Sequence, residues 1–183
     1  ICVNAAPVTT TTTTTTVVAA SEPQTLAVTV NAVADAPSLT VAGATGNEDT
    51  AIALNISSAL TDTDGSETLS VTISGVPAGA SLSAGTDNGN GTWTLTPAQL
   101  TNLKITPPAN SDADFNLTVK AISTEGAGGS AITEKTLSVV VSPVADAPVI
   151  TTVAATGNED TAISLNVGVS LPDAGETLQL LQI

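Results

Sequence analysis

A twenty-residue segment occurs twice in this chain of 183 residues, and it constrains the fold more than any other feature. "VADAPSLTVAGATGNEDTAI" begins at Val33 and "VADAPVITTVAATGNEDTAI" at Val144, an offset of 111 (144 − 33 = 111). The segment "TLAVTVNAVADAP" from Thr25 likewise matches "TLSVVVSPVADAP" from Thr136. A period of this length is the size of an independent domain and far exceeds that of a solenoid repeat. The sequence therefore predicts a row of tandem domains.

The offset also places the boundaries of these units. One complete unit is expected over residues 38–141, between linkers at 33–37 and 142–148. Residues 1–32 are expected to be the last strands of a preceding unit, and residues 149–183 the first strands of a following one, with two residues deleted near Leu171. The run of Thr at 9–16 would be a two-faced strand or a Thr-rich spacer.

Short apolar or alternating runs between turn residues predict strands throughout the complete unit. The runs are "SLTVAG", "TAIALNIS", "TLSVTISG", "SLSAG", "GTWTLTP", "LKITPP", "FNLTVKAIS" and "TEKTLSVVV". Turn residues such as "TGNED" and "TDNGNGT" separate them, and only "PAQLTNL" could form a single helical turn. Seven or eight strands in roughly 105 residues favour an all-β fold, an Ig-like antiparallel Greek-key β-sandwich.

Composition excludes several classes of function. The chain has 17 acidic against 3 basic residues, a formal charge of −14, which argues against nucleic acid or an anionic membrane as a partner. It has no His and no credible catalytic triad, so we expect no enzyme. Cys2 is the only Cys, which rules out an intrachain disulfide.

The sequence contains no apolar stretch of about 18 residues, the length that a membrane span needs, so we expect no membrane insertion. Without an initiator Met or a signal peptide, the sequence is expected to be an internal part of a longer exported chain.

The acidic residues are expected to gather at the two ends of the complete unit. If the strands wind up and down, Asp62, Asp64, Glu67 and Glu125 lie at the entry end beside Asp35, whereas Glu48, Asp49, Asp112, Asp114 and Asp146 lie at the exit end. The following unit would bring Asp173 and Glu176 to the exit end. Carboxylates about 4 Å apart repel by roughly 1–4 kcal/mol, depending on the local dielectric. A divalent cation would relieve this repulsion.

Oxygen ligands without His or a nearby Cys favour a hard cation, and outside the cell Ca²⁺ is the obvious one. The candidate ligands are Asp35, Glu48, Asp62, Asp64, Glu67, Asp112, Asp114, Asp146, Asp173 and Glu176. The plainer interpretation of "DTDGSE" (62–67) is a solvated turn, and that of "GNED" (46–49) is a turn in which Asp49 only caps the backbone. Asp114 could simply end a loop. Trp93 is expected in the core, with a sugar-stacking surface as the alternative.

Several of these motifs resemble those of known families. "LTDTDGSETLSVTISG", "ADAP", "NED" and "SDADFNLTVKA" are similar to the calcium-binding loops, linker and strands of cadherin repeats. The whole unit, from "GNEDTAIAL" to "VADAP", more closely resembles the tandem cadherin-like or Ig-like extender repeats of large bacterial RTX adhesins. The resemblance implies type I secretion, retention at the bacterial cell surface and a stalk stiffened by Ca²⁺.

The function expected from these features is structural. Each unit would be an extender in a secreted surface adhesin, with Ca²⁺ at the junctions between neighbouring repeats of the same chain, and would serve cell adhesion and biofilm formation. One alternative is a carbohydrate- or cell-binding β-sandwich module. Another is head-to-tail self-association into an extracellular filament by strand exchange, because the two incomplete ends could complement one another.

Overall fold

The computed structural model of the chain describes residues 13–14, 25–173 and 175–179 and is all-β. The chain divides into two compact units, residues 1–31 and 32–183, and every strand of the described residues belongs to the second. The expected strands of a preceding repeat, with most of the Thr run, fall largely outside the described residues. The only helical element in the described ranges is the 3₁₀ turn η1 (Pro97–Leu100), at the predicted "PAQL".

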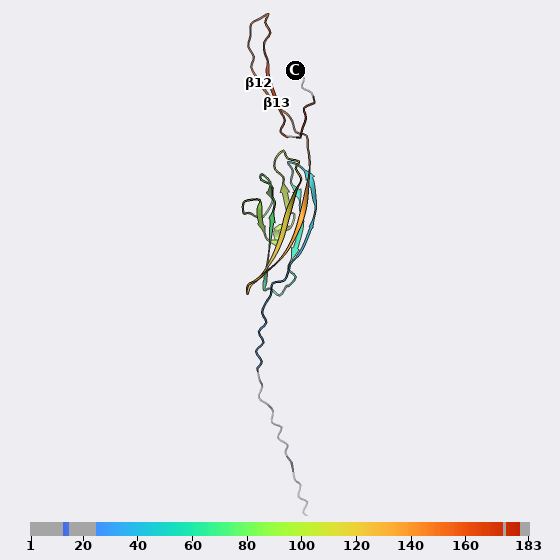
Figure 1. The fold of residues 1–183 in the computed structure, drawn as a ribbon, viewed down its shortest axis with the longest axis vertical. Helices are drawn as coiled ribbons and strands as arrows, with labels where there is room; N and C mark the ends of the chain where they lie inside the picture. Colours follow the sequence, from blue (N-terminus) through green and yellow to red (C-terminus); the bar gives the residue numbers. More distant parts are fainter. Residues whose placement is uncertain (1–12, 15–24, 174, 180–183) are drawn as a thin grey trace, which may run out of the picture. The chain divides into compact units, whose positions relative to one another are not determined.

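The largest sheet has six strands, in the order β2-β11-β10-β5-β8-β7. Their bounds are β2 (Ala44–Asn47), β11 (Ser130–Ser142), β10 (Phe115–Glu125), β5 (Glu67–Ser74), β8 (Thr92–Leu95) and β7 (Thr86–Asp87). The two longest strands, β10 and β11, lie side by side and curl along the complete unit (Figure 1). The turn "TDNGNGT" joins β7 to β8 as a hairpin, as predicted.

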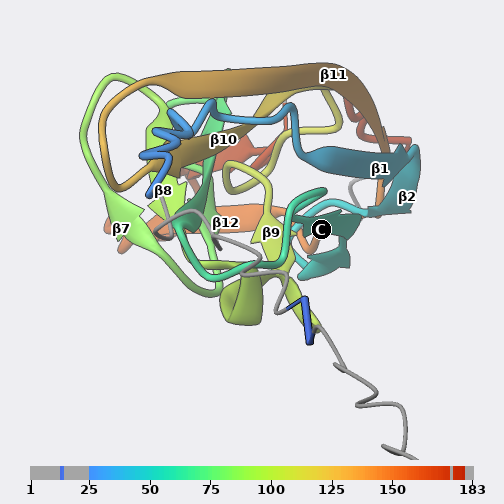
Figure 2. The ribbon, with the colours of Figure 1, turned by 90° about the horizontal axis from the view of Figure 1, so that it is seen from below.

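Smaller sheets complete the unit. β1 (Ser38–Ala42) pairs with β4 (Asn55–Ala59), and β3 (Ile52–Ala53) and β6 (Ser81–Leu82) both pair with β9 (Lys104–Thr106). Figure 2 shows β11 and β9 on opposite sides of the unit. Curled sheets of this kind are consistent with a β-sandwich.

Alternating apolar side chains from these sheets form one core. The large sheet contributes Val71, Ile73, Leu95, Leu117, Val119, Ala121, Leu137, Val139 and Val141, and the smaller sheets contribute Leu39, Ile52, Ile56, Leu82 and Ile105. Each buried Leu, Ile or Val stabilises the fold by about 1.5–3 kcal/mol before entropy is counted. Trp93 packs against this cluster but is only half-buried, so the prediction that it belongs to the core is confirmed in part.

The prediction of a purely antiparallel sandwich is wrong at one edge. "TGNED" was expected to be a turn, but its first residues lie in β2, which pairs in parallel with β11 from Val139↔Ala44 to Ser142↔Asn47. The amide of Glu48 then donates to the Ser142 carbonyl oxygen (3.0 Å). β1 and β2 are separated only by Gly43, where the chain leaves β4 and joins β11. A four-residue strand with one fully buried side chain is too short to show a period in the sequence.

The repeated sequence forms the same hairpin twice. β12 (Val149–Val153) pairs with β13 (Asn166–Ser170) in the register Val149↔Ser170, which equals Ser38↔Ala59 shifted by 111 at both positions. Residues 154–165 contain no strand, whereas their counterparts contain β2 and β3. Among the described residues, no helix has the length and apolar character needed to cross a membrane.

Candidate metal centre

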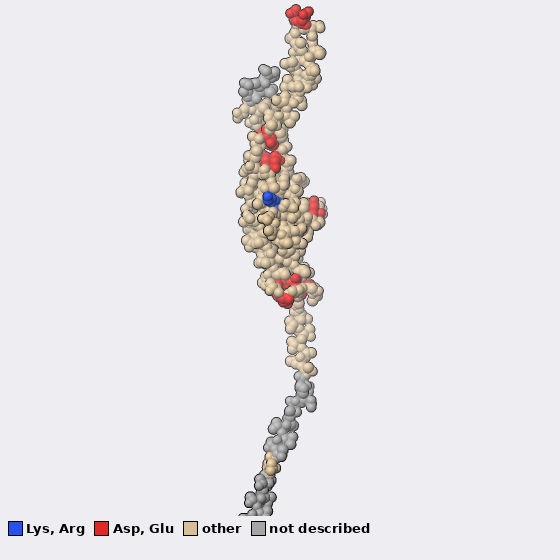
Figure 3. Space-filling view, turned by 180° about the vertical axis from the view of Figure 1, so that it is seen from behind, with Lys and Arg blue, Asp and Glu red and all other residues tan. Residues whose placement is uncertain are grey.

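The acidic residues of the complete unit gather at both of its ends, as Figure 3 shows. At the entry end, the first junction consists of Asp35, Asp62, Asp64, Glu67 and Glu125. Glu67 begins β5, Glu125 ends β10, and the two face one another directly in the antiparallel register. They are 7% and 4% exposed, so two acidic side chains are buried as cross-strand neighbours. Like charges in such a pair destabilise a sheet.

Hydrogen bonds tie the first junction to the linker. The amide of Asp35 donates to Glu67 Oε1 (2.6 Å), and the Thr61 hydroxyl donates to the Ala36 carbonyl oxygen (2.7 Å). At the same end of the unit, near the start of β11, the Thr133 hydroxyl donates to the Pro37 carbonyl oxygen (2.6 Å). These contacts fix the linker against the start of β5 and beside β11.

Ser66 links the carboxylates of this junction to each other. Its hydroxyl lies 2.6 Å from Asp64 Oδ1 and 3.1 Å from Glu125 Oε2, but one hydroxyl proton can serve only one of them at a time. Hydrogen bonds from the hydroxyl and then the amide of Ser66 lower the pKa of Asp64. Asp64 is therefore an anion at neutral pH, in a cluster with more acceptor oxygens than donors.

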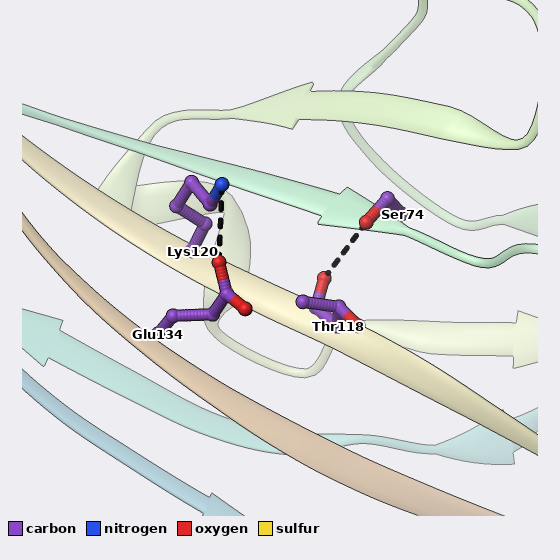
Figure 4. Close-up of polar contacts among 4 residues, drawn as sticks. All are labelled: Ser74, Thr118, Lys120 and Glu134. Atoms are coloured by element: carbon purple, nitrogen blue, oxygen red, sulfur yellow. Dashed lines mark hydrogen bonds and ion pairs between the residues drawn. The ribbon is translucent and has the colours of Figure 1, made fainter.

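One oxygen of this junction has no partner at all. Glu67 Oε2 is inaccessible to water and accepts no hydrogen bond. A buried acceptor left in this state costs about 1–3 kcal/mol. Within the described ranges the one ion pair joins Lys120 to Glu134 (3.0 Å), across the middle of β10 and β11 (Figure 4), and so neutralises none of these acids. A bound cation would satisfy this oxygen.

At the exit end, the second junction consists of Glu48, Asp112, Asp146, Asp173 and Glu176. All five line a hollow of about 860 Å³ together with linker residues, and its lining within the described residues includes no Lys or Arg. Glu48 is only 2% exposed, and its Oε1 accepts a hydrogen bond from the Val144 amide (2.6 Å). The structure thus places carboxylates from the complete unit, the linker and the following repeat around one hollow.

The same hydrogen bond from a linker amide to a glutamate occurs at both junctions. Glu176 Oε1 accepts a hydrogen bond from the Asp146 amide at 2.6 Å, as Glu67 Oε1 does from the Asp35 amide. The linker residues are 111 apart (146 − 35 = 111) and the glutamates 109 (176 − 67 = 109), which matches the deletion of two residues in the second loop. The contact is therefore a property of the repeat and survives the shorter loop.

Asp173 is the least satisfied acid of the second junction. Both of its carboxylate oxygens, and Glu176 Oε2, are shielded from water without a hydrogen-bond partner. Loss of water contact raises the pKa of Asp173, and so do the negative charges of Glu48, Asp146, Glu176 and Asp49, in that order. The carboxylate form is thus disfavoured where no cation is bound.

This shift predicts a pH dependence for the metal-free protein. Since the pKa of Asp173 is higher in the folded state than in the unfolded chain, folding takes up a proton as pH falls through the raised value. The destabilising charge is fully present above that pKa and is removed below it. Lowering the pH from about 7 toward the ordinary Asp value of about 3.9 should therefore raise the melting temperature in chelator for the wild type relative to Asp173→Asn. Equal slopes for both proteins would contradict the assignment.

Two acids of the exit end bind backbone amides of distant segments. Asp49 Oδ1 accepts a hydrogen bond from the Asn110 amide (2.9 Å), 61 residues away, and so does not cap its own turn as expected. Asp114 Oδ1 accepts one from the Val141 amide (2.8 Å), and Asp114 does not line the hollow. The remaining predicted residues lie in one junction or the other, and their role as ligands stays a prediction.

The carboxylate oxygens suit a hard cation, but in this structure they do not converge on one position. In residues 25–173 and 175–179, no three acidic side chains converge closely enough to form a ready-made metal site. The unpartnered oxygens of Glu67, Asp173 and Glu176 are nevertheless carboxylate oxygens shielded from water, the type of ligand that Ca²⁺ takes. Small rotations of these side chains would be required to enclose an ion.

The structure adds two residues to the predicted set. The sequence predicts Glu125 at the entry end but not as a ligand. It is in phase with Leu117, Val119 and Ala121, the inward positions of β10, so strand alternation indicates its burial. Ser66 lies inside the motif "DTDGSE" and supplies the hydroxyl that joins Asp64 to Glu125. A smaller hollow of about 430 Å³ lies beside Trp93, Asp87 and Asn90, and the carbohydrate alternative stays a prediction.

Comparison of the sequence with models of known protein families gives no match, and comparison with curated proteins gives none either.

Proposed function

We propose that this chain is part of an extracellular stalk, built from tandem Ig-like or cadherin-like Greek-key β-sandwich units of a secreted bacterial surface adhesin. The offset of 111 supports this proposal, because it recurs in the sequence and in the register of the β1–β4 and β12–β13 hairpins. A strand such as β11, with 13 residues at about 3.3 Å each, would let one unit add roughly 40 Å of length. The units would hold an adhesive region away from the cell and so promote adhesion and biofilm formation.

Ca²⁺ is the proposed link between neighbouring units. The observation that carries this part is the buried pair Glu67 and Glu125, with Glu67 Oε2 unpartnered, next to the linker that Glu67 itself holds. Asp35, Asp62, Asp64, Glu67 and Glu125 would hold an ion at the first junction, and Glu48, Asp112, Asp146, Asp173 and Glu176 would do so at the second. When bound, the ion supplies positive charge and oxygen coordination.

The chain's own residues explain why a cation would stiffen the junction. Glu48, Glu67 and Glu176 each accept a linker amide, so the linkers are already positioned at both ends. The same glutamates bring negative charge to acids on the adjoining segments, and this repulsion favours bending the linker away. Neutralising it would leave only the attractive contacts, which hold the two units in one orientation.

Withdrawal of Ca²⁺ should shorten and destabilise the 183-residue chain. A ligand at 100 times its Kd stabilises a folded site by about 2.7 kcal/mol, which for a unit of this size corresponds to a melting temperature higher by on the order of 10 °C. We therefore expect small-angle scattering to give a larger maximum dimension with Ca²⁺ than with chelator, and calorimetry to give a higher melting temperature. An identical dimension and melting temperature in both conditions would refute the proposal.

Asp64→Asn and Asp87→Asn form a matched pair for this experiment. Each aspartate accepts the amide of the residue two positions later at 2.8 Å, Ser66 for Asp64 and Gly89 for Asp87, but only Asp64 lies in a junction. Asp64→Asn should reproduce part of the effect of the chelator, and Asp87→Asn should leave the response to Ca²⁺ unchanged. The same loss of response in both variants would point to the turn itself and not to a metal ligand.

A further inference from the structure

Two asparagines in the turn between β7 and β8 are each followed by a glycine, and they are the only such pairs in the sequence. The pairs are Asn88–Gly89 and Asn90–Gly91, and both asparagines are exposed. A backbone nitrogen can attack the side-chain carbonyl carbon of a preceding asparagine, and glycine hinders this approach least because it has no Cβ. By sequence alone, the turn therefore contains two equivalent positions for conversion of asparagine to aspartate without an enzyme.

The structure restrains both reacting groups of the first pair. The side-chain amide of Asn88 donates a hydrogen bond to Thr94 Oγ1 (2.8 Å), and the backbone amide of Gly89 donates one to Asp87 Oδ1 (2.8 Å). The attacking nitrogen and the side chain that it must reach are thus held by separate partners. Both hydrogen bonds have to break before the two groups can meet.

The second pair has no such restraint. Among the described residues, neither the Asn90 side chain nor the Gly91 amide takes part in a hydrogen bond. The φ angles of Asn90 and Gly91 are +53° and +68°, and the Thr92 amide donates to the Gly89 carbonyl oxygen (3.1 Å), the pattern of a type I′ turn. Since β7 has only two residues and forms the edge of the large sheet, this turn can open locally while the core stays folded.

We propose that Asn90 is a site of spontaneous deamidation and that the fold directs the reaction to Asn90 in preference to Asn88. The Gly91 nitrogen forms a bond to Asn90 Cγ, the Cγ–Nδ2 bond breaks, and the amide proton leaves with the departing nitrogen as ammonia. Water then opens the resulting five-membered succinimide. Opening at Cγ gives an ordinary aspartate, whereas opening at the backbone carbonyl carbon gives isoaspartate, in which the main chain runs through the former side chain.

The turn has little space for the longer main chain of isoaspartate, which places one additional carbon between Asn90 Cα and the Gly91 nitrogen. A Cβ added to Gly91 would lie 2.4 Å from the Val76 carbonyl oxygen, and the Val76 amide donates to the Gly91 carbonyl oxygen (3.1 Å). Both residues line the hollow beside Trp93. We therefore expect isoaspartate to disrupt the contact between Val76 and the turn and to expose Trp93 further.

The reaction is independent of the proposed metal sites, because neither Asn90 nor Gly91 belongs to a junction. Its rate should be the same in chelator and in Ca²⁺. The two proposals can therefore fail separately.

The test is peptide mapping by mass spectrometry of the full chain after ageing at mildly alkaline pH, which favours the deprotonated nitrogen. In the folded protein we expect aspartate and isoaspartate to form roughly tenfold faster at Asn90 than at Asn88, because two hydrogen bonds restrain Asn88. In concentrated urea the two rates should converge, since both residues precede glycine, so Asn88 is a control within the same molecule. Equal rates in the folded protein, faster reaction at Asn88, or an unreacted Asn90 when the urea sample has reacted would each overturn the proposal.

The fluorescence of Trp93, the single Trp of the chain, tests the structural consequence. Its emission should shift to longer wavelength as isoaspartate forms, and the melting temperature should fall. Asn90→Asp adds the same charge without lengthening the main chain and should keep the wild-type emission. Asn90→Gln, which would have to close a six-membered ring, should keep its own emission on ageing. An equal shift in fresh Asn90→Asp, or the wild-type shift in aged Asn90→Gln, would contradict the proposed effect of isoaspartate at this position.

Discussion

In chelator, Glu67→Gln is expected to raise the melting temperature of the chain, and in Ca²⁺ the same substitution is expected to remove most of the stabilisation due to the ion. The amide keeps an oxygen for the Asp35 amide, removes one of two facing negative charges and replaces the unpartnered Oε2 by a donor. Relief of a buried unsatisfied acceptor corresponds to on the order of 1–2 kcal/mol. Calorimetry in both conditions measures the two effects.

The opposite signs make this prediction specific. A purely structural glutamate would give destabilisation in both conditions when replaced. Glu159→Gln is the control, because it removes the same charge from an exposed position of the following repeat and should change neither melting temperature by more than a small amount. A lower melting temperature of Glu67→Gln in chelator would show that the Glu67 carboxylate does not destabilise the metal-free fold.

Ile73→Ala is expected to lower the free energy of unfolding by about 2–5 kcal/mol. Ile73 lies near the end of β5, is fully buried, and belongs to the core that the large sheet and the smaller sheets share. The loss combines the transfer of its side chain with a cavity that neighbouring Leu and Val residues fill only in part. Denaturant unfolding followed by circular dichroism, or by the fluorescence of the single Trp93, measures the change.

Ile132→Ala provides the matched control, since Ile132 is the same residue type in the long strand β11 but is 52% exposed. Its replacement should change the free energy of unfolding by less than about 1 kcal/mol. Equal effects at both positions would contradict the assignment of the core, whatever the role of the junctions.

Sequence periodicity predicted most of the strands because their inward positions alternate clearly. The runs at 115–123 and 133–141 became β10 and β11, and "PAQL" became the single helical turn. The strand β2 could not be predicted in this way, because only its pairing with β11, about 95 residues away, turns "ATGN" into a strand. The residues 155–158 illustrate the same point, since an equivalent sequence without that partner forms no strand.

The candidate site was predictable to a similar degree. Strand direction placed Glu67 and Glu125 at one end and Glu48 and Asp146 at the other, and the structure brings these groups together. Which oxygens remain free was not predictable, because it depends on individual hydrogen bonds. Asp49 and Asp114 bind backbone amides, whereas Glu67 and Asp173 keep unpartnered oxygens.

The parallel pairing of β2 with β11 determines how the unit carries a mechanical load. β2 follows the entry linker closely and β11 leads into the exit linker, and the two strands run in the same direction. A tension that pulls the linkers apart therefore slides one strand along the other. All four pairs of that ladder therefore bear the load together instead of opening one after another.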